Sequence, residues 1–287
     1  MKSTIEVVKY FCIKYNGDWE KVFEAIKTKE VIDEKLFSEM DLNNLKVKSK
    51  TIMESDYSDS FKGFYKPPLC LFYEGNEKLF DPDVPSITLY YGNPDKYNQN
   101  EPECLRQTLE ILKEIPKEIP LKFAFDINNK FQNVIIAKAM SEERKLIVFT
   151  PSILDMNKNK EEQDLFEYCT SGKGVIISES FISDEKNYDL KVNRNNHLVG
   201  STSYLLLVAS AEKSSDKNVV ITSALSNGKE IYVAPHLYGS NTLNNQLISE
   251  GADPLCDSEQ IPEYFRKNEG FIKLQQINGK DKEIGGR

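Results

Sequence analysis

The sequence has little of what marks an exported, membrane-bound or metal-binding protein. No apolar run approaches the about 18 residues that a membrane-spanning helix needs, and the N-terminus lacks the segments of a secretory signal. The five cysteines are widely spaced without a Cys-x-x-Cys pair, and the chain has only two histidines. We therefore expect a soluble cytoplasmic protein with free thiols, no metal site and no membrane partner.

Motifs of catalysis and cofactor binding are also missing. The sequence has no Gly-x-x-x-x-Gly-Lys-Ser/Thr phosphate loop, no Gly-x-Gly-x-x-Gly fingerprint and no Gly-x-Ser-x-Gly nucleophile elbow. It also lacks the Pro-Gly-Gly-x-Gly-Thr-x-x-Glu loop of the Rossmann-like proteins that hydrolyse nucleoside monophosphates. We therefore expect that the protein is not an enzyme and has no catalytic residue and no cofactor. A Rossmann-like nucleotide-binding hydrolase stays as an alternative.

Basic residues are not in excess over the whole chain. The net charge of −8 argues against a diffuse basic surface that coats nucleic acid. Between residues 186 and 217, however, five basic residues stand against three acidic ones. This excess fits either a solvated face or a local binding site. The basic residues are Lys186, Lys191, Arg194, Lys213 and Lys217.

What the chain does contain is a series of short apolar runs separated by helix-compatible segments. Such runs suit strands buried on both faces of a parallel sheet, and their alternation with helices indicates βαβ units. The sequence therefore predicts an α/β fold with a doubly wound, mostly parallel sheet. The expected strands are 86–91, 121–125, 145–150, 174–178, 204–209 and 230–234.

The organisation around this sheet follows from local signals. Residues 4–50 carry apolar residues at helical spacing, with a break at Asn16-Gly17 and Asp18 as the cap of the next helix. Pro67-Pro68 forces an extended approach to the first strand. We predict a small helical domain over residues 1–52, a main domain over 53–262, and a partly disordered tail over 263–287.

Several motifs occur in a characteristic order. Residues 67–76 read Pro-Pro-Leu-Cys-Leu-Phe-Tyr-Glu-Gly-Asn, Arg194-Asn195-Asn196 follow later, then Val233-Ala234-Pro235, and residues 245–252 read Asn-Gln-Leu-Ile-Ser-Glu-Gly-Ala. This order resembles the DprA/Smf family of DNA-processing proteins. The resemblance implies a Rossmann-like domain that binds single-stranded DNA, delivers it to the RecA recombinase in recombination and natural transformation, and forms a homodimer.

The sequence departs from the family where phosphate would be held. The family's Gly-Ser-Arg turn corresponds to Gly92-Asn93-Pro94, so the arginine is lost. A family motif rich in glycine, with an aspartate and a histidine, is replaced over residues 125–135. The resemblance is that of a diverged member without the winged-helix domain, and the alternative is a scaffold protein that has lost useful DNA affinity.

The best candidate anion site is the segment Arg194-Asn195-Asn196. We expect a helix to begin there after Asn193, which would leave unpaired amides beside a guanidinium suited to phosphate oxygens. The alternative is that Arg194 pairs with a local carboxylate such as Asp189.

The rest of the predicted site comes from the strand ends. Gly92 and Asn93 follow a predicted strand, and ligands of open α/β sheets bind at the carboxyl ends of strands. We therefore expect Gly92 and Asn93 on the same edge of the sheet as Arg194, with Lys191 and Lys217 completing a nucleic-acid-binding site.

Overall fold

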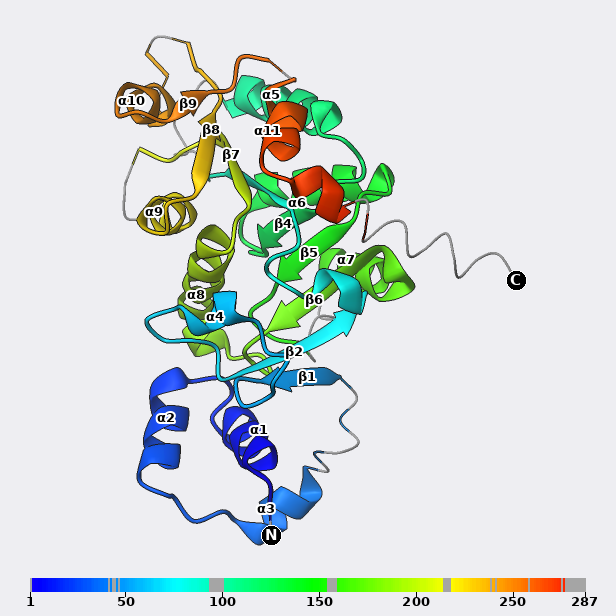
Figure 1. The fold of residues 1–287 in the computed structure, drawn as a ribbon, viewed down its shortest axis with the longest axis vertical. Coiled ribbons are helices and arrows are strands. Elements are labelled where there is room, and N and C mark those ends of the chain that lie inside the picture. The colour runs from blue at the N-terminus through cyan, green and yellow to red at the C-terminus, as the bar shows by residue number, and fades with distance from the viewer. Residues whose placement is uncertain are drawn as a thin grey trace, which may run out of the picture. The chain divides into compact units, whose positions relative to one another are not determined.

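The structure is a computed structural model that describes residues 2–40, 42, 45, 47–92, 101–153, 159–213, 218–237, 239–240, 242–257, 259–274 and 276 (Figure 1). The chain divides into two compact units. Unit 1 comprises Met1–Pro82 and Phe149–Lys191, and unit 2 comprises Asp83–Val148 and Val192–Arg287. None of the helices in the described ranges has the length and hydropathy of a membrane span.

Unit 1 begins with the helices α1 (Thr4–Lys14), α2 (Trp19–Lys27) and α3 (Glu34–Glu39). The predicted break between the first two is confirmed. Asn16 and Gly17 adopt positive φ angles of 47° and 74°, and the Asp18 side chain accepts from the Lys21 amide as the cap of α2. The chain thus reverses where the sequence places a turn and a cap.

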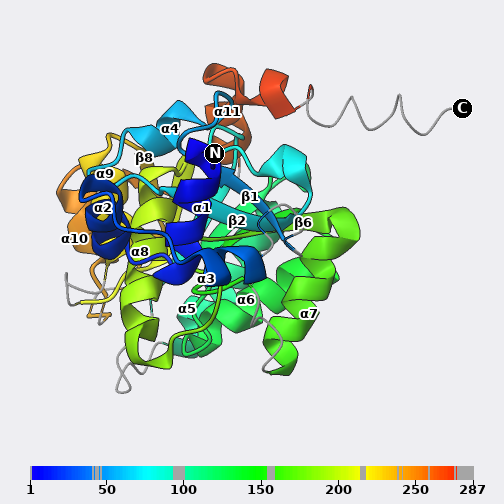
Figure 2. The same ribbon diagram turned by 90° about the horizontal axis from the view of Figure 1, so that it is seen from below.

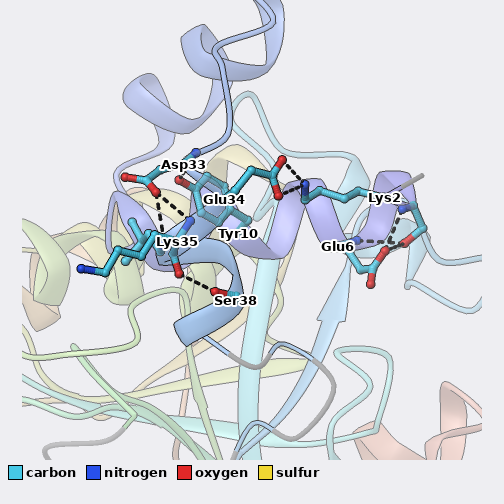
Figure 3. Close-up of polar contacts among 9 residues, drawn as sticks. Lys2, Glu6, Tyr10, Asp33, Glu34, Lys35 and Ser38 are labelled. Carbon is cyan, nitrogen blue, oxygen red and sulfur yellow. Dashed lines mark hydrogen bonds and ion pairs between the residues drawn. The ribbon is translucent and has the colours of Figure 1, made fainter.

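Helix α3 is attached to α1 by polar contacts (Figure 3). Lys2 forms an ion pair with Glu34 at 2.5 Å, and the Asp33 amide donates to the hydroxyl of buried Tyr10 at 3.2 Å. Asp33 also caps α3 by accepting from the Lys35 amide at 2.9 Å. Exposed ion pairs contribute little to stability, so the buried Tyr10 is the stronger anchor.

The strands of unit 1 are β1 (Lys48–Thr51), β2 (Cys70–Gly75) and β6 (Gly174–Ser178), in the order β1-β2-β6 with antiparallel pairing. Helix α1 packs against β1 and β2 (Figure 2). Sequence reasoning missed β1 and treated its residues as part of the helical segment. The strand reads Lys-Ser-Lys-Thr, and such a polar edge strand gives no hydrophobic signal. The other elements are α4 (Asp59–Lys62), η1 (Glu77–Leu79), α7 (Lys160–Tyr168), η2 (Cys169–Lys173) and η3 (Glu185–Asn187).

Unit 2 contains a parallel sheet. The strands β4, β3, β7, β8 and β9 pair in this order, and every one of these pairings is parallel. The predicted α/β class with a mostly parallel sheet is therefore confirmed. The strands are β3 (Ile87–Tyr91), β4 (Leu121–Ala124), β5 (Leu146–Phe149), β7 (Leu205–Ser210), β8 (Glu230–Val233) and β9 (Asp253–Pro254). The helices are α5 (Glu101–Glu114), α6 (Lys130–Ser141), α8 (Tyr188–Ser201), α9 (Val219–Ser226), α10 (Asn244–Ser249) and α11 (Gln260–Lys267).

The core of unit 2 surrounds β7, which is buried along its whole length. On one face Leu206 and Val208 pack with Val220 and Ala224 of α9. Burying each such side chain contributes about 1.5–3 kcal/mol, so α9 is positioned mainly by hydrophobic contacts. Further along the chain, α11 buries Phe265 fully, and the predicted domain end at residue 262 lies inside this helix.

Candidate nucleic-acid interface

The strands β3, β7 and β8 of unit 2 end at one edge, which we call the carboxyl edge. In the pairing register Tyr91 at the end of β3 lies beside Ser210 at the end of β7, and Val208 lies beside Val233 at the end of β8. The segments that follow these strands therefore leave the sheet close together. In open parallel sheets this edge is where ligands bind.

The turn after β3 has room only for glycine. The Gly92 amide donates to the Ser210 carbonyl at 2.8 Å. A Cβ atom on Gly92 would come within 2.9 Å of the Glu212 Cγ atom and 3.0 Å of the Glu212 backbone nitrogen. The turn is thus packed against the segment after β7. Because the contacting residue is a glutamate, it also brings a carboxylate-bearing side chain to this turn.

Asn218 organises the segment after β7. Its Oδ1 atom accepts from the Glu212 amide at 3.1 Å and from the Tyr90 hydroxyl at 3.0 Å, while its Nδ2 atom donates to the Glu212 carbonyl at 2.7 Å. Asn218 is buried and immediately precedes α9. These bonds fix the backbone of Glu212 relative to β3, so the carboxyl edge is preorganised at this point.

Asn244 does the same for the segment after β8. Its side chain is fully buried, accepts from the Ala211 amide at 2.8 Å, and donates to the carbonyls of Ala209 and Ala234 at 3.0 and 2.8 Å. One asparagine thereby joins the ends of β7 and β8 to the start of α10. Sequence reasoning missed Asn218 and Asn244 as structural residues, because neither lies directly after a strand.

His236 is a structural histidine in its neutral form. Its Nε2 atom lies 2.8 Å from the Ala209 carbonyl, which can only accept, so Nε2 carries the proton. Its Nδ1 atom then accepts from the Thr242 hydroxyl at 2.8 Å. Burial lowers the pKa of His236, and the hydrogen bond to Ala209 opposes this shift only in part.

The Cys104 thiol lies 4.0 Å from the Nδ1 atom of His236. Burial, with a smaller contribution from Glu103, raises the pKa of Cys104. The raised thiol pKa and the lowered histidine pKa both favour the neutral pair over a thiolate and an imidazolium. This geometry does not activate a nucleophile.

The expected start of the helix at Asn193 is wrong. The η3 turn leads into α8, which begins at Tyr188. Arg194, Asn195 and Asn196 therefore lie beyond the first turn, where backbone amides are paired within the helix. The prediction failed because Asn193 was taken as the cap, while the acidic Asp189 favours an earlier helix start. An anion could be held here by side chains, but not by free helix amides.

The side chains of this segment differ in exposure. Asn195 is 3% exposed, and its Nδ2 atom has no hydrogen-bond partner among the described residues. Arg194 and Asn196 are half-buried. In unit 1, Lys191 is half-buried, and its buried Nζ atom has no partner in the described ranges. Burial lowers the pKa of Lys191, and Asp184 and Asp18 oppose this shift.

Helices α8 and α9 pack against each other through residues that follow Arg194. The His197 ring contacts the Ser223 hydroxyl at 2.9 Å, and the Asn227 amide donates to the Ser201 hydroxyl at 3.1 Å. Gly200 lies directly against the backbone of Val220. These contacts do not involve Arg194, so its placement toward the carboxyl edge stays a prediction.

The structure describes only some of the other predicted site residues. Gly92 lies at the carboxyl edge, as its turn requires. Asn93 and Lys217 lie outside the described residues. No cluster of three or more metal-ligating side chains occurs in the ranges that the structure describes. A shared groove of Gly92 and Arg194 stays a prediction.

Comparisons with known proteins agree with this architecture. DNA processing protein A from Streptococcus pneumoniae aligns with a TM-score of 0.62 and 18% identity, over 85% of this chain and 80% of that chain. DNA processing protein A from Helicobacter pylori, studied for its single-stranded DNA binding mode, aligns with a TM-score of 0.54 and 18% identity, over 78% of this chain and 98% of that chain. No curated protein matches.

The sequence comparison points to the same proteins as the structural one. Residues 132–266, which contain α8, α9, α10 and the ends of β7 and β8, match the sequence model of the DNA recombination-mediator protein A family. The family resemblance that we inferred from the order of the motifs is thereby confirmed. Over this segment the chain is similar to the DprA/Smf family of DNA-processing proteins.

Proposed function

We propose that this protein binds single-stranded DNA at the carboxyl edge of unit 2 and, as a homodimer, passes it to a RecA-type recombinase without catalysing a reaction. The observation that carries the proposal is the Gly92 turn, which keeps its packing against the end of β7 inside a DprA/Smf fold. The single-stranded DNA binding named for the Helicobacter pylori protein supports the choice of ligand.

The cation of the proposed site is Arg194. A guanidinium forms charge-assisted hydrogen bonds with phosphate oxygens, and the Arg194 side chain is half-buried. Asn195, with an unpartnered buried Nδ2 atom on the same helix, adds a donor that a ligand oxygen could satisfy. Lys191, Asn196, Asn93 and Lys217 complete the proposed set.

One feature favours a second function. Glu212 packs against Gly92, and Pro94 stands where the family has an arginine, so the phosphate-holding turn has lost a positive charge and gained a negative neighbour. The net charge of −8 adds repulsion over a longer range. The competing candidate is therefore a scaffold that keeps the fold and a protein partner but binds DNA too weakly to use it.

Competition binding separates the two candidates. Fluorescently labelled oligo-dT is titrated with the full chain at low salt, and unlabelled oligo-dT or duplex is then added. If the protein binds single-stranded DNA, oligo-dT should compete far better than duplex. In a duplex the bases are stacked and their edges are paired, so the site cannot reach them. Equal competition by duplex, or no binding by a protein that melts cooperatively, supports the scaffold instead.

The site is tested by Arg194→Ala, with Arg266→Ala as a matched control. Arg266 is an exposed arginine on α11 that pairs with Glu259. Removing a charge-assisted hydrogen bond costs about 1.5–3 kcal/mol, so Arg194→Ala should weaken oligo-dT binding at least tenfold while Arg266→Ala leaves it unchanged. Equal effects of the two variants would remove Arg194 from the site.

A further inference from the structure

Two cysteines of unit 1 meet between α1 and β2. Cys12 on α1 and Cys70 on β2 are 3% and 2% exposed, and both line one cavity of about 10 Å³. A cavity of this size holds about one water molecule, so the two side chains on its wall are close neighbours. Helix α1 packs against β2, and the Cys70 side chain is the largest cause that raises the pKa of the Cys12 thiol.

The other cysteines have different surroundings. Cys104 in unit 2 faces His236, Cys169 is buried on η2, and Cys256 is exposed. Cys12 and Cys70 are thus the pair that the fold itself places together, although 57 residues separate them in sequence, from residue 13 to residue 69. A disulfide can form without a movement of the backbone only where the two cysteines already lie close together. Cysteines on adjacent elements can meet this requirement.

We propose that Cys12 and Cys70 are an oxidisable dithiol, and that their disulfide ties the N-terminal helix α1 to strand β2. The inference does not depend on DNA binding. The oxidant is a peroxide of the size of hydrogen peroxide. One thiol attacks the peroxide, becomes a sulfenic acid and releases water; the other thiol then displaces a second water from this sulfenic acid and forms the sulfur–sulfur bond. Two electrons pass from the two sulfurs to the peroxide.

The surroundings make this reaction selective rather than fast. The Cys70 side chain and burial raise the pKa of the Cys12 thiol, and the carboxylate of Glu179, which lines the same cavity, adds to the shift. A low thiolate fraction slows attack on the oxidant. Once one sulfur is oxidised, however, the neighbouring thiol is already in place to react with it.

The chain carries its own reporter for this reaction. Trp19, the single tryptophan, lines the same cavity as the two cysteines. Disulfides quench nearby tryptophan fluorescence, so closing the Cys12–Cys70 bond should lower the emission of the folded protein. Trp19 also forms a stacked pair with Phe23 at 4.8 Å between ring centroids, which keeps its position fixed during the measurement.

The experiment uses the full chain with Cys256→Ser, because the exposed thiol would otherwise cross-link molecules. Five cysteines less Cys256 leave four thiols. Hydrogen peroxide should reduce the count in denatured, alkylated protein from four to two and lower Trp19 emission, and dithiothreitol should reverse both changes. Peptide mass spectrometry should find the peptides of Cys12 and Cys70 joined with the loss of two hydrogen atoms.

Two variants define the controls. Cys70→Ser in the same background should abolish the fluorescence change, whereas Cys169→Ser, which removes another buried thiol, should keep it. If a core variant fails to fold, the peptide map of the parent protein still decides. Sulfinic acid on Cys12 or Cys70 without a joined peptide, or a joined peptide that forms only in denaturant, would overturn the proposal.

Discussion

The packing of α8 on α9 can be tested by one methyl group, in the variant Gly200→Ala. A Cβ atom on Gly200 would lie 2.3 Å from the Val220 carbonyl oxygen and 2.9 Å from the Ser223 Cβ atom. The first contact is with helix backbone, which cannot rotate away as a side chain can. The two helices must therefore move apart, and α8 carries the proposed Arg194 site with it.

Two effects oppose each other in this variant. Alanine is better than glycine in a helix interior by about 1 kcal/mol. Overpacking a well-packed site costs typically about 1–3 kcal/mol, and a contact this short with backbone belongs at the upper end. The clash outweighs the propensity gain, and we expect Gly200→Ala to lower the free energy of unfolding by about 2 kcal/mol.

The matched control is Gly63→Ala. Gly63 has φ −70°, and a Cβ atom there would meet nothing closer than 3.8 Å. This variant should be neutral or more stable by up to about 1 kcal/mol. The assay is urea denaturation followed by far-ultraviolet circular dichroism, since Trp19 reports only on unit 1. A Gly200→Ala protein as stable as the wild type would refute the packing argument.

Three further predictions concern the carboxyl edge. Glu212→Gln removes the charge that packs against Gly92 and should tighten oligo-dT binding by on the order of 1 kcal/mol at low salt; unchanged affinity would place the DNA elsewhere. Asn244→Ala leaves the Ala211 amide and the Ala234 carbonyl without this partner and removes one of two donors from the Ala209 carbonyl, so it should cost on the order of 3 kcal/mol in urea denaturation, and a cost near zero would contradict the network. Because burial lowers the pKa of His236 below its usual 6.5, the unfolded chain binds the proton more readily, so stability should fall as pH drops from about 6.5. His236→Gln should flatten this fall, and an equal fall in both proteins would show that other groups cause it.

Much of the fold could be predicted from the sequence because buried parallel strands leave a strong signal. The run 174–178 coincides with β6, and the run 86–91 contains β3. Strand β1 could not be found in this way, since a four-residue polar edge strand is defined by its partner rather than by its own residues.

The site was harder to predict than the sheet. Gly92 could be placed because a turn after a strand needs little more than local sequence. The start of α8 could not, because the cap signal of Asn193 was given more weight than the acidic Asp189, which lies in the first turn of the actual helix. The roles of Glu212, Asn218 and Asn244 depend on which strand ends meet, and this is known only once the parallel register is known.

The central claim is that the carboxyl edge of unit 2 binds the phosphates of single-stranded DNA. The most direct test is the affinity of the full chain for oligo-dT across a salt series. The slope of log K against log salt should be about −0.7 for each phosphate neutralised. With Pro94 in place of the family's arginine, we expect a shallow slope that corresponds to only a few phosphates, and a smaller one still for Arg194→Ala. Binding that does not change with salt, or no binding at the lowest salt by the folded protein, would contradict the account.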